Sequence, residues 1–505
     1  MTTKAILAVD QGTTNTKAML VDTEGRVLVE ASRPLALRYP HRGWAELDAE
    51  DLWRSVIGAV DECLERERSV GLLGMAITNQ RESTLLWERA NGMPAGPCVV
   101  WQCRRSAEIC NRLRANGLEP VLRTRTGLPI DPLFSASKAR WLLDHLPGGQ
   151  RRAADGELCF GTVDSWLLWK LTGGRVHATD MSNASRTQLF NIFDRRWDPD
   201  LLEVFDLPGS MLPDVRDSGS VFGTTTAVGR LEGGIEVVAM IGDSHASLFG
   251  QRVFTPGRVK ATYGTGSSLM TLTNGPVPSE RLATTIAWAM DRVDYALEGN
   301  ISSTGAAVQW IEEILACRAV GDSLDQLVQQ TGDSGGVYLV PAFVGLGAPY
   351  WEESAQGVIC GLTRGSGRAE LARAALESVA YQVRDVFDTL AEESDSKMEV
   401  LLADGGGSKN DTLMQFQADI LDRPVQRDEA KNLSALGAAY VAGTTLGLWR
   451  MEDIEALPRQ VQRFEPSMSA ARRTQLYEGW QAAVVRALPQ RGVPLGIGGA
   501  ISGTA

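Results

Sequence analysis

Residues 5–29, AILAVDQGTTNTKAMLVDTEGRVLV, decide how the rest of the chain is interpreted. The apolar run at residues 6–9 predicts a buried central strand that ends at Asp10, and the polar turn at residues 12–14 leads into a returning strand. Gly12 lets the backbone turn, the amides and hydroxyls that follow suit an anion, and Asp10 can hold magnesium directly or through water. By itself this motif fits an ordinary hairpin with a polar tip equally well.

Length and composition predict a large folded protein with two lobes. The chain has 505 residues, of which 44% are hydrophobic and 22% are charged. We expect an N-terminal lobe at residues 1–251 and a C-terminal lobe at residues 252–505, with a hinge near residue 251.

A formal net charge of −12 argues against a nucleic-acid partner, because nucleic-acid-binding proteins usually carry excess Lys and Arg. Without a charged leader or an apolar run of about 20 residues, we expect no membrane partner and a cytoplasmic location.

Polar side chains follow several of the predicted strands in the first half. The strand at residues 72–78 is followed by Asn79, Gln80, Arg81 and Glu82, and the apolar residues before Gly242 lead to Asp243. In open α/β sheets, ligands bind outside the carboxyl ends of the strands. The sequence therefore predicts a polar ligand site at one edge of the first sheet.

The second half of the chain repeats the same pattern. The strand at residues 259–263 runs into Gly264-Thr265-Gly266, and the strand at residues 400–404 runs into Gly405-Gly406-Gly407 before a helix. A strand, a glycine turn and a helix start make a natural anion or nucleotide contact. Neither the Walker pattern nor a complete dinucleotide fingerprint is present in the sequence, which disfavours the more familiar nucleotide folds.

Taken together, the ordered blocks DQGTTNTKA, ITNQRES, SNASRT, YGTGSS, YALEG, GLGAPYW, MQFQADIL and ALGAAYVAG give a specific resemblance. The chain resembles the FGGY carbohydrate kinases of the actin/Hsp70-like ATPase superfamily, and among them the members that phosphorylate glycerol. The resemblance implies a two-lobed α/β fold of ribonuclease H-like type, with a duplicated mixed sheet core and an interlobe cleft. It also implies ATP-dependent phosphorylation of a terminal hydroxyl of a small polyol.

The resemblance further implies a role for each residue of the site. ATP and Mg²⁺ are the expected cofactors, with Asp10 serving the metal and Asp243 acting as general base. Arg81 and Glu82 would grip the substrate hydroxyls, and Trp101 would form an apolar wall. The nucleotide would contact Thr13, Thr14, Asn15, Lys17, Thr265, Gly305, Gln309, Gly406 and Asn410, with Lys17 where the glycerol-phosphorylating members usually have Arg. Phosphoryl transfer needs such phosphate donors, a metal and a carboxylate that accepts the alcohol proton.

Two alternatives, in which these residues have only a structural role, stay open at this point. Asp243 could be the N-cap of the helix that follows it, since Asp is a favoured N-cap residue. Arg81 and Glu82 could form a surface ion pair, which is the usual fate of adjacent charges.

The expected substrate pocket departs from the glycerol-phosphorylating members. They present Tyr, Gln and Phe around glycerol, and the matching positions here are Leu133, Ser244 and Ser268, with His245 beside Ser244. A roomier, more polar pocket would suit a four- or five-carbon polyol or sugar, unless neighbouring residues refill the volume.

A remote alternative is a non-metabolic actin/Hsp70-like ATPase, which would use ATP to switch conformation. A homodimer or a homotetramer is the candidate assembly. The glycine-rich tail at residues 492–505 is expected to be frayed.

Overall fold

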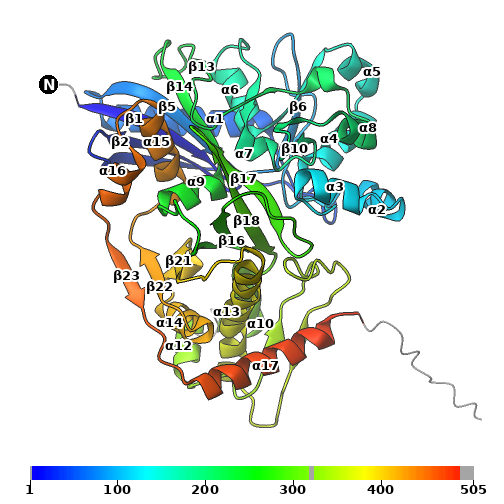
Figure 1. Ribbon diagram of the computed structural model, residues 1–505, viewed down its shortest axis with the longest axis vertical. Helices are drawn as coiled ribbons and strands as arrows, with labels where there is room; N and C mark the ends of the chain where they lie inside the picture. The colour runs from blue at the N-terminus through cyan, green and yellow to red at the C-terminus, as the bar shows by residue number, and fades with distance from the viewer. Residues whose placement is uncertain (1–2, 318–322, 490–505) are drawn as a thin grey trace, which may run out of the picture.

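The computed structural model describes residues 3–317 and 323–489, so the predicted frayed tail lies outside the described residues. Two lobes are each built around a mixed sheet (Figure 1). The first sheet has six strands in the order β13-β14-β5-β1-β2-β3, and the second has seven in the order β17-β18-β16-β15-β21-β22-β23. The predicted two-lobed α/β fold with a duplicated sheet core is confirmed.

In the first sheet, an antiparallel hairpin adjoins two parallel strands. β1 pairs antiparallel with β2 and parallel with β5, and β5 in turn pairs parallel with β14. The predicted apolar run at residues 6–9 is fully buried in β1. The strands are β1 (Lys4–Gln11), β2 (Asn15–Asp22), β3 (Val27–Pro34), β5 (Gly71–Asn79), β13 (Gly223–Thr224) and β14 (Glu236–Gly242).

The second sheet repeats this arrangement. β15 pairs antiparallel with β16 and parallel with β21, as β1 does with β2 and β5. The strands are β15 (Arg258–Tyr263), β16 (Ser267–Thr273), β17 (Ala283–Ala289), β18 (Val293–Ile301), β21 (Val400–Asp404), β22 (Val425–Asp428) and β23 (Val461–Phe464). The turn at residues 264–266 therefore occupies in the second lobe the place that residues 12–14 occupy in the first.

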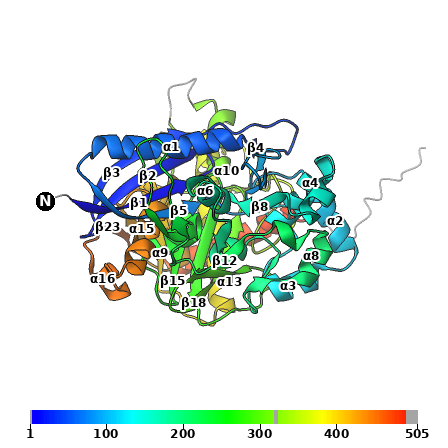
Figure 2. The same cartoon turned by 90° about the horizontal axis from the view of Figure 1, so that it is seen from above.

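Helices cover the first sheet on both faces. α1 (Ala49–Arg66) packs on β2 and β3, as Figure 2 shows from above, and its apolar residues Leu52, Val56 and Val60 are buried at helical spacing. On the other face lie α9 (Asp243–Gly250) and α15 (Leu433–Thr445), which contact each other and β5.

The α9/α15 crossing is unusually close. A Cβ on Gly437 would lie 1.8 Å from the Ala246 carbonyl oxygen, so only glycine fits there. α15 belongs to the sequence range expected for the second lobe, yet it packs on the first sheet. The division at residue 251 stays a prediction.

The second lobe carries its own helices. They are α10 (Gly305–Ile314), α12 (Leu324–Gln329), α13 (Arg368–Glu393), the short η2 (Gly407–Lys409), α14 (Asp411–Leu421) and α17 (Ala470–Ala487). α16 (Met451–Ala456) follows α15 near the first lobe (Figure 1). A two-stranded sheet pairs β19 (Tyr338–Val340) with β20 (Val358–Cys360).

The rest of the first lobe is an insertion of short elements around a four-stranded sheet. Its strands are β4 (Glu46–Leu47), β7 (Cys98–Val99), β6 (Thr84–Glu88) and β8 (Leu158–Thr162), in that order. Two small pairs are β9 (Ala178–Asp180) with β12 (Asp214–Arg216), and β10 (Phe190–Asn191) with β11 (Arg196–Trp197). The helices are α2 (Ala107–Ala115), α3 (Glu119–Thr126), α4 (Ser135–His145), α5 (Gly149–Ala154), α6 (Val163–Leu171), α7 (Met181–Ala184), α8 (Pro199–Phe205) and η1 (Gly209–Met211). Across the described part of the chain, no helix is both long and apolar enough to span a bilayer.

Candidate active site

Three parallel strands of the first sheet end side by side. The register aligns Gln11 of β1 with Asn79 of β5, and Asn79 with Gly242 of β14. Asp10, Arg81 and Asp243 therefore lie at the same edge of the sheet, as the sequence predicts. This edge faces the second lobe, because Arg81 pairs with Glu298 of β18.

Arg81 is held by carboxylates from both lobes. Its Nε donates to Asp243 Oδ1 at 3.2 Å, Nη1 donates to Glu298 Oε2 at 3.0 Å, and Nη2 donates to Glu298 Oε1 at 2.7 Å. Glu298 is 0% exposed and Arg81 is 7% exposed. Burial raises the pKa of Glu298, but Arg186 and Arg81 oppose it and hold that pKa well below its usual range.

Glu82 is held in turn by Arg186, which follows α7. Arg186 Nε donates to Glu82 Oε1 at 2.7 Å, and its Nη2 lies 2.8 Å from Glu298 Oε2. Glu82 has a φ of 60°, which is rare for a residue with a side chain and marks a backbone fixed by its surroundings. Arg81 and Glu82 thus pair with other residues inside the protein, so their interpretation as a surface ion pair is wrong.

Asp243 opens α9 at the end of β14. The N-cap of α9 is Gly242, so the interpretation of Asp243 as the N-cap is wrong. Its Oδ1 accepts the Ser244 N–H at 2.6 Å, and its side chain remains 34% exposed. Burial raises the pKa of Asp243, Arg81 lowers it and Glu82 raises it, with the net shift upward. A raised pKa suits a carboxylate that accepts a proton.

Asp10 is a nearly buried carboxylate that faces Lys17 across the β1/β2 pair. It is 8% exposed, and it takes no hydrogen bond or ion pair from residues 3–317 or 323–489. Burial raises the pKa of Asp10 to about 6, Lys17 lowers it, and Asp243 raises it. Asp10 is thus a buried carboxylate whose charge is influenced by Asp243 and which has no polar partner among residues 3–317 and 323–489.

The predicted phosphate contacts gather on the turns of both lobes. Thr13 and Thr14 lie between β1 and β2, whereas Asn15 and Lys17 belong to β2 itself. Thr13 Oγ1 accepts the indole N–H of Trp101 at 2.9 Å, which ties the expected apolar wall to the phosphate turn.

In the second lobe, Thr265 and Gly305 are in direct backbone contact. The Thr304 and Ala306 N–H groups donate to the Thr265 carbonyl at 3.0 Å, and the Gly305 N–H donates to the Gly264 carbonyl at 3.0 Å. The start of α10 is therefore fixed on the turn, and Gln309 lies one helical turn further along α10.

Gly406 and Asn410 complete the predicted nucleotide set beyond β21. Gly405 has a φ of +87°, and a Cβ there would lie 2.5 Å from the Tyr263 carbonyl oxygen, so glycine lets this turn pack on the end of β15. A Cβ on Gly406 would meet open space, which leaves room for a ligand. Asn410 caps α14 by accepting the Leu413 N–H at 2.9 Å.

The residues expected to enlarge the substrate pocket behave differently from one another. Ser268 Oγ donates to Glu298 Oε1 at 2.8 Å, and Ser244 Oγ lies 3.5 Å from Ser268 Oγ, so both serines adjoin the Arg81 cluster. Leu133 instead packs against the buried cluster Leu128, Phe134 and Ala283. His245 is fully buried with Nε2 3.2 Å from Thr285 Oγ1, and burial holds its pKa well below the usual range.

Glu298 and Arg186 are site residues that were not predicted from the sequence. The signal was present in each case: Glu298 is the one carboxylate in the apolar centre of YALEG, and Arg186 lies in SNASRT. Charged residues are almost never fully buried unless they are paired. A charge inside an apolar strand therefore indicates a partner, although not which one.

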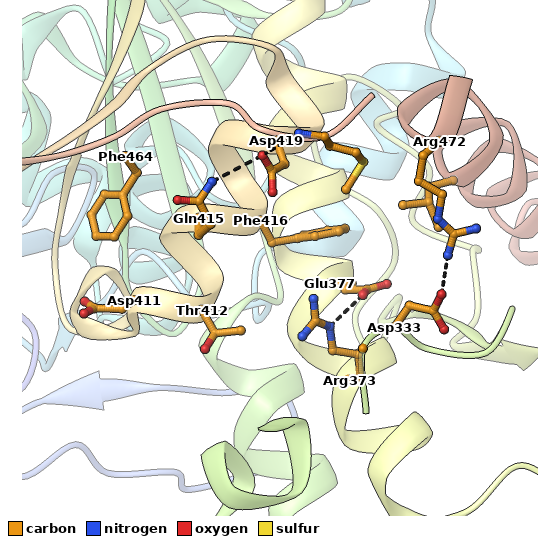
Figure 3. A pocket seen from close by; sticks show the side chains of 13 residues that line it. Asp333, Arg373, Glu377, Asp411, Thr412, Gln415, Phe416, Asp419, Phe464 and Arg472 are labelled. Atoms are coloured by element: carbon orange, nitrogen blue, oxygen red, sulfur yellow. Dashed lines mark hydrogen bonds and ion pairs between the residues drawn. The ribbon is translucent and has the colours of Figure 1, made fainter. Parts of the chain in front are cut away.

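A separate cavity of 650 Å³ lies among α13, α14 and α17 (Figure 3). Two ion pairs line it, Arg373 with Glu377 and Arg472 with Asp333. Phe416 and Phe464 provide apolar surface. The residues that line this cavity do not include any of the predicted site residues.

The two lobes, each built on a mixed sheet and facing each other at the strand ends, have the actin/Hsp70-like fold. The N-terminal and C-terminal domains of the FGGY family of carbohydrate kinases match residues 5–250 and 259–446. The chain belongs to the FGGY family of carbohydrate kinases.

Individual relatives agree with this assignment. The chain is 49% identical to glycerol kinase of Stenotrophomonas maltophilia, over 97% of this chain and 99% of the relative. It is 45% identical to glycerol kinase of Desulfitobacterium hafniense, over 95% and 99%. The crystal structure of Plasmodium falciparum glycerol kinase with ADP superposes with a TM-score of 0.90 at 30% identity, over 97% of this chain and 99% of that chain.

Proposed function

We propose that the protein transfers the γ-phosphate of ATP to a terminal hydroxyl of glycerol, forming glycerol 3-phosphate and ADP. The observation that carries the proposal is the Arg81–Asp243 pair, a substrate-gripping cation beside a partly exposed carboxylate at the sheet edge. The whole-chain similarity to proteins named glycerol kinase supports the choice of glycerol.

In this proposal, Asp243 removes the proton of the attacking hydroxyl. The hydroxyl oxygen forms a bond to the γ-phosphorus, the bond from that phosphorus to the β,γ-bridging oxygen breaks, and ADP leaves. Arg81 and Glu82 bind the hydroxyls of the substrate, and the Trp101 ring lies against its carbon chain. Positioned acid and base groups of this kind typically contribute 10²–10⁴-fold to a rate.

ATP is proposed to lie between the two turns. Its phosphates would meet the N–H and hydroxyl groups of Thr13, Thr14 and Thr265, with Lys17 supplying positive charge. The adenosine part would lie along the residues Gly305, Gln309, Gly406 and Asn410. A hinge near residue 251 would close the lobes and exclude water from the transfer.

Magnesium fits the site at Asp10. Mg²⁺ is usually bound by one or two carboxylates together with waters and substrate phosphates, so a single unpaired carboxylate beside the phosphate turn is sufficient. Asp10 would hold the ion, which would neutralise charge on the phosphates. Lys17, across the strand pair, would share this task.

The substrate panel is the direct test of glycerol as the acceptor. We expect kcat/KM for glycerol to exceed that for erythritol, threitol, xylitol and ribitol by more than tenfold, with saturating ATP and magnesium. Ser268 already donates its hydroxyl hydrogen to Glu298, so it has no hydrogen left for an added hydroxyl, and the side chain of Leu133 has no polar atom to bind one.

A longer polyol within tenfold of glycerol, or above it, would favour the alternative acceptor that Leu133, Ser244 and Ser268 suggest. Dihydroxyacetone has the same chain length as glycerol but one hydroxyl fewer, so its kcat/KM separates the effect of chain length from that of hydroxyl count. A tenfold ratio corresponds to about 1.4 kcal/mol of transition-state preference, within the range that one methylene can supply.

A non-metabolic ATPase on this fold would hydrolyse ATP at the same rate with and without polyols. The buried Arg81, Glu82 and Asp243 cluster argues against it, because a conformational switch needs no such group. The homodimer or homotetramer and the cytoplasmic location stay predictions, and sedimentation velocity would measure the assembly.

A further inference from the structure

We propose that Glu298 is the positioning residue of the polyol site, and that it holds the two Nη atoms of Arg81 away from Asp243 so that Arg81 can bind substrate. The inference rests on the proposed function, since it explains how Arg81 is held in the position in which it would bind the substrate.

Glu298 stands at the centre of the cluster. Its two oxygens accept from both Nη atoms of Arg81 and from Ser268 Oγ, and Oε2 also lies 2.8 Å from Arg186 Nη2. Bidentate pairing of this kind fixes the plane of a guanidinium group as well as its position. Because Glu298 is fully buried, truncating it would leave two buried arginines without their shared partner.

The donors of Arg81 show what this arrangement leaves for a substrate. A guanidinium group has five N–H bonds. One of those in Arg81 goes to Asp243 and two go to Glu298. The other two take no acceptor from the described residues 3–317 and 323–489, so they remain for the hydroxyls of a polyol.

Asp243 is the acceptor that Arg81 would take if Glu298 were absent. It already accepts from Arg81 Nε, and only its second oxygen is needed for a bidentate pair. Such a pair would occupy an N–H group of Arg81 that is otherwise open to the substrate. It would also stabilise the charged form of Asp243, which would make Asp243 a weaker proton acceptor. Glu298 thus limits the contact between Arg81 and Asp243 to the single hydrogen bond from Nε.

The same carboxylate also fixes Glu82. Arg186 joins Glu298 to Glu82 Oε1, and its guanidinium group lies over the Phe134 ring at 5.2 Å. Both substrate-gripping residues of the first lobe therefore depend on one side chain of the second lobe, on β18. The polyol site is complete only when the two lobes are together.

The test is the kinetics of Glu298→Gln. We expect KM for the polyol to rise at least tenfold and kcat to fall, while KM for ATP with magnesium changes less than twofold. Glu298→Asp keeps the charge but withdraws it by one methylene, and should recover part of the polyol affinity. A purely structural role would lower stability and the active fraction without separating the two KM values.

Glu377→Gln is the matched control. Glu377 is also a buried second-lobe glutamate, and its Oε1 accepts from Arg373 Nε at 2.8 Å beside the cavity of Figure 3. We expect this variant to lose thermal stability and to keep the polyol KM. An unchanged polyol KM in Glu298→Gln, or an equal rise in both KM values, would overturn the inference.

A crystal structure of Glu298→Gln separates this inference from the proposed function. Lack of phosphate transfer to any polyol by the unaltered protein would overturn the proposed function alone. The inference is tested separately by the position of Arg81 in the variant, where we expect the guanidinium group to pair with both oxygens of Asp243. A guanidinium group in the same position as in the unaltered protein would overturn the inference. If Glu298→Gln does not fold, Glu298→Asp is used in the same measurements.

Discussion

Replacing Asp243 with Asn is expected to lower kcat by about 10²-fold or more while the fold and ATP binding are kept. Asn has nearly the same shape, and its side-chain oxygen can still accept from Arg81 Nε and from the Ser244 N–H. What it cannot do is take the proton of the substrate hydroxyl. Steady-state kinetics with glycerol, together with ATP binding by calorimetry, measures both parts of the expectation.

Asp198→Asn is the matched control for this substitution. Asp198 is likewise a first-lobe carboxylate at the start of a helix, and it caps α8 by accepting backbone N–H groups. Since Asn caps helices about as well as Asp, turnover should stay near normal. Near-normal turnover in a folded Asp243→Asn protein would remove Asp243 from the role of base.

Asp10→Ala is expected to abolish turnover and leave the fold intact. The carboxylate takes no hydrogen bond or ion pair within residues 3–317 and 323–489, so its removal breaks no polar contact there. Burial of its charge is unfavourable, as the raised pKa of Asp10 shows. The loss of activity would arise from misplaced magnesium and phosphates. Activity measured against magnesium concentration, with circular dichroism for the fold, is the test.

The control for Asp10 is Asp164→Asn. Asp164 follows the end of β8 and is also buried with a raised pKa, but Thr162 and Thr179 donate hydrogen bonds to it. This variant should keep the magnesium dependence of the unaltered protein. An Asp10→Ala protein with unchanged magnesium dependence would contradict the assignment.

Local patterns were sufficient to predict the elements that carry the site. The apolar run and polar turn of residues 5–29 became β1 and β2, and the strand predicted at residues 259–263 became β15. Element boundaries are harder to predict from such patterns, because residues 161–174 divide between β8, which extends to Thr162, and α6, which covers Val163–Leu171. Nearly every side chain of α6 is buried, so hydrophobic periodicity does not separate a buried strand from a buried helix there.

Long-range partners could not be predicted in this way. Arg81 and Glu298 are 217 positions apart, and nothing in either local pattern names the other. The same holds for α15, whose mostly apolar sequence predicts burial without indicating which sheet it covers. Position in the chain favoured the second lobe, whereas the close glycine crossing with α9 places α15 on the first.

That crossing has a consequence for synthesis of the protein in the cell. The first sheet buries Ile6, Ala8 and Met19 in a cluster with Leu433 and Leu436, so its core is completed only by residues translated long after its own strands. Ribosomes add about 5–20 residues per second, so the ~190 residues between α9 and the end of α15 take roughly 10–40 s. During that interval the nascent first lobe exposes an apolar face, and a chain ending at residue 251 would expose it permanently.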